Sequence, residues 1–123
     1  MYLAFDEKRR TPRVPTKLDA AVVTDRRILF RCVILDINVY GARLEVGGEA
    51  PPERFHLIDL LSGVGYEARI MWRQTPMVGT RFLATWNLAS ADAPQWLKDM
   101  RNDILRADAE ERGIRLVWSA PPA

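Results

Sequence analysis

The stretch VGYEARIMWRQTPMVGTRFLATW, residues 64–86, decides the fold class. Within residues 64–73 and again within 78–86, apolar and polar side chains alternate, a pattern typical of half-buried β-strands. The alternation predicts that one face of each strand enters the core. Those core-facing residues are Tyr66, Ala68, Ile70 and Trp72 in the first strand, and Thr80, Phe82, Ala84 and Trp86 in the second.

Apolar runs upstream predict further strands at residues 18–24, 28–35, 42–46 and 55–60. Turn-forming residues separate them, including Gly47-Gly48 and Pro51-Pro52. About six short antiparallel strands joined by tight turns indicate a mostly β fold, a small barrel or curled sheet that closes its own edges.

Residues 93–112 change to helical periodicity and predict a C-terminal α-helix. Its apolar stripe has two interpretations, packing on the barrel or docking a partner. Residues 114–118 form an edge strand or belong to the tail. We therefore expect four segments: a basic arm (1–17), a β-barrel (18–90), a helix (91–113) and a tail (114–123).

The chain has 123 residues, 48% of them hydrophobic and 28% charged, as in a globular domain. Its single cysteine, Cys32, cannot form an internal disulfide and suits a reducing compartment. No apolar run is long enough to cross a membrane, and no signal peptide is evident. We expect a cytoplasmic protein without membrane insertion.

Catalytic and metal-binding patterns are weak. His56 is the only histidine, and no local pattern supports pairing it with Cys32 as a nucleophile. There are too few Cys and His residues for a zinc site, and no phosphate-binding loop or nucleophile elbow occurs. An enzyme, a metal site and a bound cofactor are therefore not expected.

A basic stretch, EKRRTPRVP at residues 7–15, precedes the first strand. Pro12 and Pro15 favour an extended backbone, in which Arg9 and Arg13 share one face. Two guanidinium groups on one face suit phosphates or the O6/N7 edge of guanine. The alternative interpretation is a solvated arm that contributes only charge.

A second short stretch, DINVYG at residues 36–41, follows a strongly apolar strand. The Asp36 carboxylate suits the N–H donors of a guanine, and Asn38 carries both a donor and an acceptor. Gly41 permits a sharp turn or a close approach to its backbone. An Asx turn between two strands uses the same residue types, so this interpretation stays open.

Together the two stretches resemble the PilZ domain family, bacterial receptor modules for cyclic di-GMP. Arg9-Arg10-Thr11-Pro12-Arg13 is similar to the family's RxxxR motif. The stretch at 36–41 is similar to its (D/N)xSxxG motif except that Asn38 replaces the serine. The late pair of strands around residues 68–82 also looks like the family's hairpin.

The resemblance implies a six-stranded antiparallel barrel that binds cyclic di-GMP on its outer surface. It assigns Arg9 and Arg13, helped by Arg10, to phosphates and guanine edges, and Asp36 and Asn38 to guanine recognition. It assigns Gly41 to the turn that shapes the site. Asn38 in place of serine weakens binding, changes the ligand stoichiometry or abolishes binding.

Three hypotheses follow. The leading one is a stand-alone cyclic di-GMP receptor in second-messenger signalling, in which the ligand orders the arginine arm and alters binding to an unidentified effector protein. The alternative is a degenerate adaptor that acts through protein–protein contacts without the nucleotide. Binding of single-stranded DNA or RNA is not expected, because the aromatic residues of the late strands are predicted to lie in the core.

Overall fold

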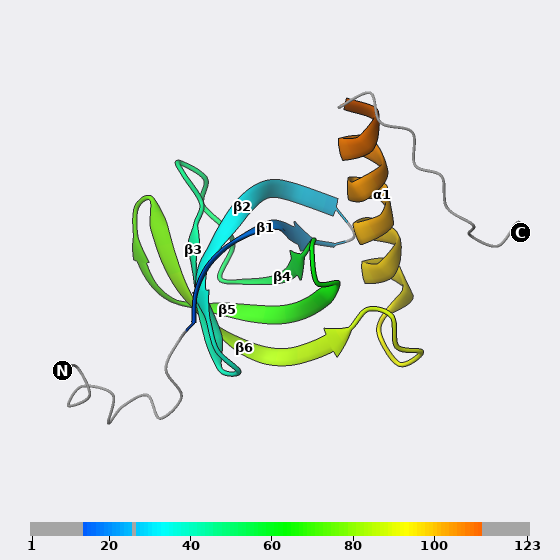
Figure 1. Cartoon of the computed structure of the whole chain (residues 1–123). Helices are drawn as coiled ribbons and strands as arrows, with labels where there is room; N and C mark the ends of the chain where they lie inside the picture. The colour runs from blue at the N-terminus through cyan, green and yellow to red at the C-terminus, as the bar shows by residue number, and fades with distance from the viewer. Residues whose placement is uncertain (1–13, 26, 112–123) are drawn as a thin grey trace, which may run out of the picture.

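The computed structural model describes residues 14–25 and 27–111. It contains six β-strands followed by one α-helix (Figure 1). In chain order these are β1 (Val14–Thr24), β2 (Arg27–Ile37), β3 (Gly41–Glu45), β4 (Arg54–Asp59), β5 (Val64–Gln74), β6 (Met77–Asn87) and α1 (Gln95–Glu111). The expected strand at 114–118 lies outside the described residues.

The six strands form one antiparallel sheet in the order β1-β2-β3-β6-β5-β4. Pairing of β1 with β4 closes the sheet into a barrel, so neither strand is left as an open edge. The prediction of a six-stranded antiparallel fold with a C-terminal helix is confirmed. The strands are longer than expected at several ends, and β1 already begins at Val14.

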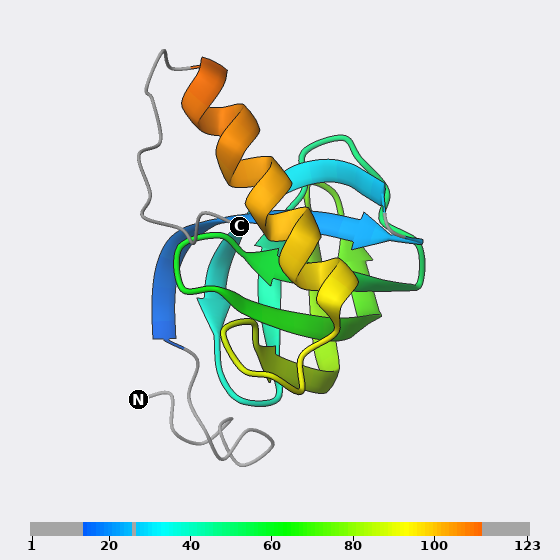
Figure 2. The ribbon, with the colours of Figure 1, turned by 90° about the vertical axis from the view of Figure 1, so that its right-hand side faces the viewer.

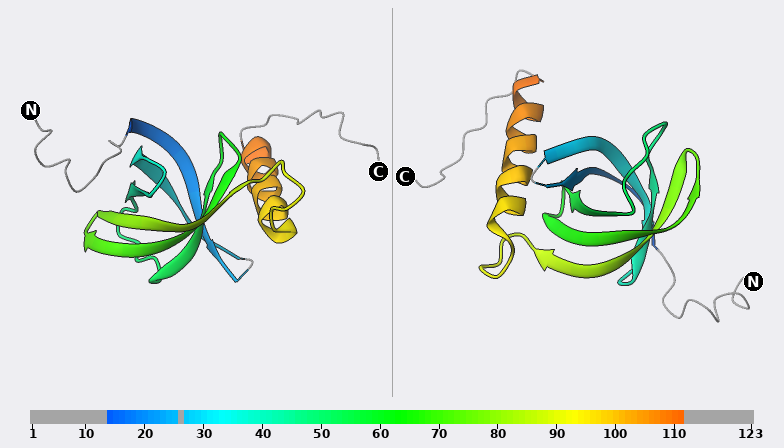
Figure 3. Two further views of the ribbon diagram at one scale, coloured as in Figure 1. Left: turned by 90° about the horizontal axis from the view of Figure 1, so that it is seen from below. Right: turned by 180° about the vertical axis from the view of Figure 1, so that it is seen from behind.

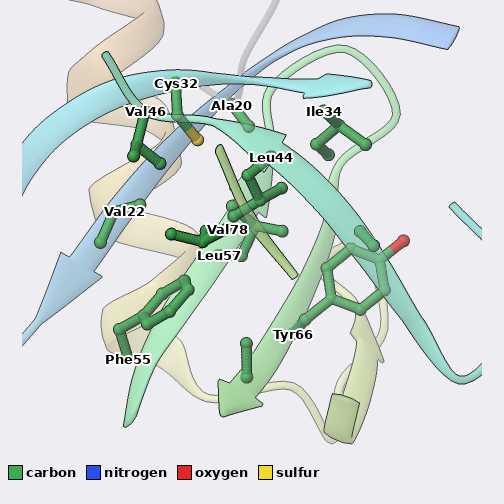
Figure 4. Close-up of a cluster of buried hydrophobic side chains, with 12 residues drawn as sticks. Ala20, Val22, Cys32, Ile34, Leu44, Val46, Phe55, Leu57, Tyr66 and Val78 are labelled. Atoms are coloured by element: carbon green, nitrogen blue, oxygen red, sulfur yellow. The ribbon is translucent and has the colours of Figure 1, made fainter. Parts of the chain in front are cut away.

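The barrel interior is filled by aliphatic side chains from all six strands (Figure 4). Ile34, Leu44 and Leu57 are completely buried there. At one end Tyr66 stacks on Phe82 with 4.0 Å between ring centroids. Burial raises the pKa of the Tyr66 hydroxyl to about 12. These interior contacts fix the strand register, because a one-residue slip would expose every one of these side chains.

Two β-bulges reverse the predicted alternation in the late strands. Ile70 pairs with Thr80, but the next pair is Trp72 with Gly79, which leaves Met71 as an extra residue. Trp72 therefore points to the outer surface instead of the core, and 38% of its surface is exposed. The expectation that it shares the core face with Ile70 was wrong.

The second bulge lies in β6, where Glu67 pairs with Ala84 and Ala68 pairs with Phe82. The extra residue places Ala84 and Trp86 on the outer side of the barrel, so the predicted core face of β6 ends at Phe82. Trp86 packs instead against a second hydrophobic cluster outside the barrel.

Helix α1 crosses the outside of the barrel and covers that second cluster (Figure 2). Leu97, Met100 and Ile104 of its apolar stripe are buried against β1 and β4 residues such as Ala21 and Ile58. The barrel-packing interpretation of the stripe is confirmed, so this stripe is not available to a partner. Polar contacts hold the helix in register, with Arg31 Nη1 2.9 Å from Asp108 Oδ1 and Arg101 Nη2 donating to the Leu60 carbonyl oxygen at 2.8 Å.

His56 lies beneath the start of α1 on the outer face of β4. Its ring meets Trp96 edge-on at 4.9 Å and stacks near Trp86 at 6.1 Å between centroids. Burial among these rings lowers the pKa of His56 below its usual 6.5, and the nearby Glu67 carboxylate partly opposes the shift. The folded protein therefore favours the neutral imidazole.

This shift predicts a pH dependence of stability. As pH falls below 6.5, the unfolded chain protonates His56 before the folded protein does, so stability is lost on acidification. Urea unfolding at about pH 7.5 and about pH 5.5 measures the loss, and His56→Gln is expected to reduce it. An equal loss in the variant would show that other groups cause it.

Candidate functional site

A bulge in β2 sets the direction of Asp36. Ile34 pairs with Leu44, but the next pair with β3 is Asp36 with Arg43, which leaves Leu35 as the extra residue. Without it, Asp36 would follow Ile34 into the barrel interior, since residues two apart share a face. The bulge turns the Asp36 side chain to the outer surface.

Asp36 is held there by an ion pair with the neighbouring strand. Its Oδ2 lies 2.9 Å from Nε of Arg43, and the Asp36 side chain is 14% exposed while that of Arg43 is 40% exposed. On its other side Asp36 pairs with Pro15 of β1. The point where the described chain begins therefore lies beside Asp36, on the side of the barrel away from α1 (Figures 1 and 3).

Residues 38–41 form a tight turn between β2 and β3. Oδ1 of Asn38 accepts hydrogen bonds from the backbone N–H of Tyr40 at 2.8 Å and of Gly41 at 3.1 Å. The N–H of Asn38 donates to the Gly41 carbonyl oxygen at 3.0 Å. The Asx-turn interpretation is thus correct for the oxygen of Asn38. The turn leaves Val39 and Tyr40 at its tip, 72% and 59% exposed.

Gly41 is required by a close approach of β6. A Cβ atom at this position would overlap the Thr80 carbonyl oxygen. Beside it the buried Thr80 hydroxyl donates to the Ala42 carbonyl oxygen at 2.9 Å and accepts from the Ala42 N–H at 3.3 Å. Of the two roles expected for Gly41, close approach to its backbone is the one observed.

The outer surface next to this turn carries an aromatic ring. The Trp72 indole lies on the backbone of Gly79, where a Cβ atom would overlap its Nε1. Gly79 also pairs with Arg43, so one row across the outer face runs through Asp36, Arg43, Gly79 and Trp72. A carboxylate, a guanidinium group and an indole thus lie on adjacent strands.

Comparison with known proteins identifies the family of the chain. The family described as "PilZ domain" matches residues 7–88, two thirds of the chain. The chain belongs to the PilZ domain family. PilZ is a cyclic di-GMP-binding family.

A solved structure, described as the crystal structure of the PilZ domain of CeSA from a cellulose-synthesizing bacterium, is 14% identical. The match covers 80% of this chain and 99% of that one with a TM-score of 0.49. No curated protein matches the chain.

In this PilZ domain, the structure brings together only part of the predicted site. Asp36, Asn38 and Gly41 lie within a stretch of six residues around one turn. Three residues predicted to bind the ligand lie outside the described residues: Arg9, Arg10 and Arg13. Sequence reasoning missed Arg43, Thr80 and the outward position of Trp72, because each depends on pairing between distant strands.

The residues considered for catalysis do not meet. Cys32 is buried in the barrel interior, and its burial raises the thiol pKa to about 12. His56 lies on the outer side beneath α1. Within residues 14–25 and 27–111, no cluster of three His, Cys, Asp or Glu side chains suits a metal ion, and no helix is both long and apolar enough to cross a membrane.

The close approach at Gly41 predicts a large effect of one methyl group. Gly41→Ala forces β3 and β6 apart and is expected to lower the free energy of unfolding by about 1–3 kcal/mol. Gly48→Ala is the matched control, since nothing lies within 4 Å of its added Cβ, and a change below about 0.5 kcal/mol is expected. Urea unfolding of both variants measures the difference, and equal effects would contradict this role of Gly41.

Proposed function

We propose that this PilZ domain is a cyclic di-GMP receptor that signals through altered binding to an effector protein. The observation that carries the proposal is the bulge at Leu35, which presents the Asp36 carboxylate on the outer surface beside the start of β1. The RxxxR stretch immediately precedes that start in the sequence. The sequence thus connects the RxxxR stretch directly to the strand that pairs with Asp36.

Asp36 is suited to read guanine. A carboxylate accepts up to about four hydrogen bonds, and its two oxygens match the N1–H and N2–H₂ donors of the base. Arg43 also fixes the orientation of the carboxylate before the ligand arrives. Such preorganisation lowers the entropy cost of binding.

In this proposal Asn38 acts mainly through the turn and not as a direct guanine ligand. Its Oδ1 is committed to the turn, so any contact with a guanine comes from the amide N–H₂ group. A serine at this position accepts the same turn hydrogen bonds while projecting less far toward the ligand. We infer that Asn38 maintains the turn and tunes the affinity.

The arginine arm supplies the anion contacts. Arg9 and Arg13, helped by Arg10, would grip phosphates and guanine edges while Asp36 holds the base. The ligand then bridges residues 8–14 to the turn at 36–41 and orders the arm against the barrel. This ordering changes the surface offered to the effector protein.

Calorimetric titration with cyclic di-GMP tests the receptor directly, with GMP and cyclic di-AMP as controls. Arg9→Ala and Arg13→Ala are each expected to cost a charge-assisted hydrogen bond, about 1.5–3 kcal/mol, or roughly ten- to hundred-fold in affinity. Arg106→Ala, on the exposed face of α1, is the matched control and is expected to leave affinity unchanged. Unchanged affinity in both arm variants would refute the site assignment.

Substitution of Asn38 provides a separate test. Asn38→Ser is expected to retain the turn and to bind cyclic di-GMP at least as tightly as the wild type. Asn38→Ala removes the acceptor of two backbone hydrogen bonds and is expected to lose about 0.5–2 kcal/mol of stability. Weaker binding by the serine variant, with the fold intact, would show that the asparagine is itself a preferred ligand residue.

The adaptor remains the second candidate. One observation favours it: Asp36 and Asn38 already have partners within the protein, Arg43 and the backbone of the turn. A folded protein that gives no heat and no thermal stabilisation with cyclic di-GMP would support the adaptor. Its partner would then bind the barrel rather than the helix stripe, which is buried.

A further inference from the structure

Three arginines form a row across the outer face of the barrel. Arg54 of β4 pairs with Arg69 of β5, and Arg69 pairs with Arg81 of β6. All three side chains are exposed. The row ends at Gly41, which pairs with Arg81 on β3.

This arrangement is unfavourable for the protein alone. Directly opposed residues in antiparallel strands have Cβ atoms about 5 Å apart, and like charges at that distance repel. Within the described residues, the row forms one ion pair, in which Glu53 Oε2 lies 3.7 Å from Arg69 Nε. In the part of the chain that the structure describes, neither Arg54 nor Arg81 forms an ion pair.

Exposed apolar and aromatic side chains border the row. Trp72 lies on Gly79, two residues from Arg81 along β6. The bulged residue Leu83 is 43% exposed on the other side of Arg81. Tyr40 lies at the end of the row, and its carbonyl oxygen accepts a hydrogen bond from the Phe82 N–H at 2.7 Å. Arginine, tryptophan and tyrosine are the side chains that most often dominate binding energy in protein interfaces.

We propose that this surface, defined by Arg54, Arg69, Arg81, Trp72, Leu83 and Tyr40, docks an acidic segment of a partner protein that also carries apolar side chains. Charge complementarity identifies the partner, since its carboxylates would relieve the repulsion within the row. The bordering apolar residues give such a segment contacts that a purely charged polymer cannot use. The surface borders the candidate nucleotide site, because Tyr40 belongs to the turn at 38–41 and Trp72 lies in the same row as Asp36 and Arg43.

The charge pattern favours a protein segment over a nucleic acid. Residues 14–111 carry fourteen acidic and twelve basic side chains, so the positive charge of the row is local. Glu67 lies on β5 two residues from Arg69, and Glu53 immediately precedes β4, so both would repel a phosphate backbone that extends beyond the row. A peptide whose carboxylates are separated by other residues can keep them away from Glu53 and Glu67.

Fluorescence anisotropy with two labelled peptides tests the proposal on the full chain without cyclic di-GMP. One is a short poly-L-glutamate, and the other has equal charge with leucines between the glutamates. We expect the leucine-containing peptide to bind more tightly. The combined Arg54→Gln, Arg69→Gln and Arg81→Gln variant is expected to weaken its binding at least about ten-fold.

The control removes the same charge elsewhere, through Arg27→Gln, Lys98→Gln and Arg106→Gln combined, and is expected to change affinity less than about three-fold. In the variant with Arg54→Gln, Arg69→Gln and Arg81→Gln the repulsion within the row is removed. This variant is therefore expected to melt no lower than the wild type. A combined Arg→Glu variant of the row should abolish binding. Equal losses in the row and control variants would overturn the proposal.

Two other outcomes would also overturn it. Equal binding of the two peptides would mean that the surface recognises charge alone. Tighter binding of oligothymidine of equal charge at the same salt concentration would assign the row to nucleic acid. Because no cyclic di-GMP is present, these results are separate from success or failure of the receptor proposal.

Discussion

The extra residue Leu35 in β2 is the feature on which the site depends. In a regular strand Ile34 and Asp36 would face the same side. The extra residue allows Ile34 to be buried while Asp36 faces outward. The packing of the barrel interior fixes Ile34, so the position of the carboxylate is fixed as well. The charge is therefore carried on a strand held by pairing on both sides, not on a loose loop.

The barrel divides its chemistry among three surfaces. The interior is apolar and fixes the register of the strands. The outer side of β1 and β4 is covered by α1, which seals Trp86 and His56 from most of the solvent. The remaining outer surface carries Asp36, Arg43 and Trp72 together with the arginine row. Covering one side with the helix thus leaves the opposite side for binding.

Sequence reasoning predicted the elements well and the facing of side chains less well. Six strands and one helix were correct because long alternating and helical patterns are local signals. The outward positions of Trp72 and Trp86 were missed because single-residue bulges reverse the alternation without a mark in the sequence. Arg43 was missed because its ion pair depends on β2–β3 register, and only the short turn around Asn38 was readable locally.

The burial of Cys32 has a practical consequence for labelling. The chain has one cysteine, and its thiol is enclosed in the barrel with a pKa near 12, so the reactive thiolate is scarce at neutral pH. A cysteine introduced at an exposed position, such as Leu61, would then be the only thiol that reacts readily with a fluorophore or spin label. The native protein therefore already supplies a background suited to single-site spectroscopy.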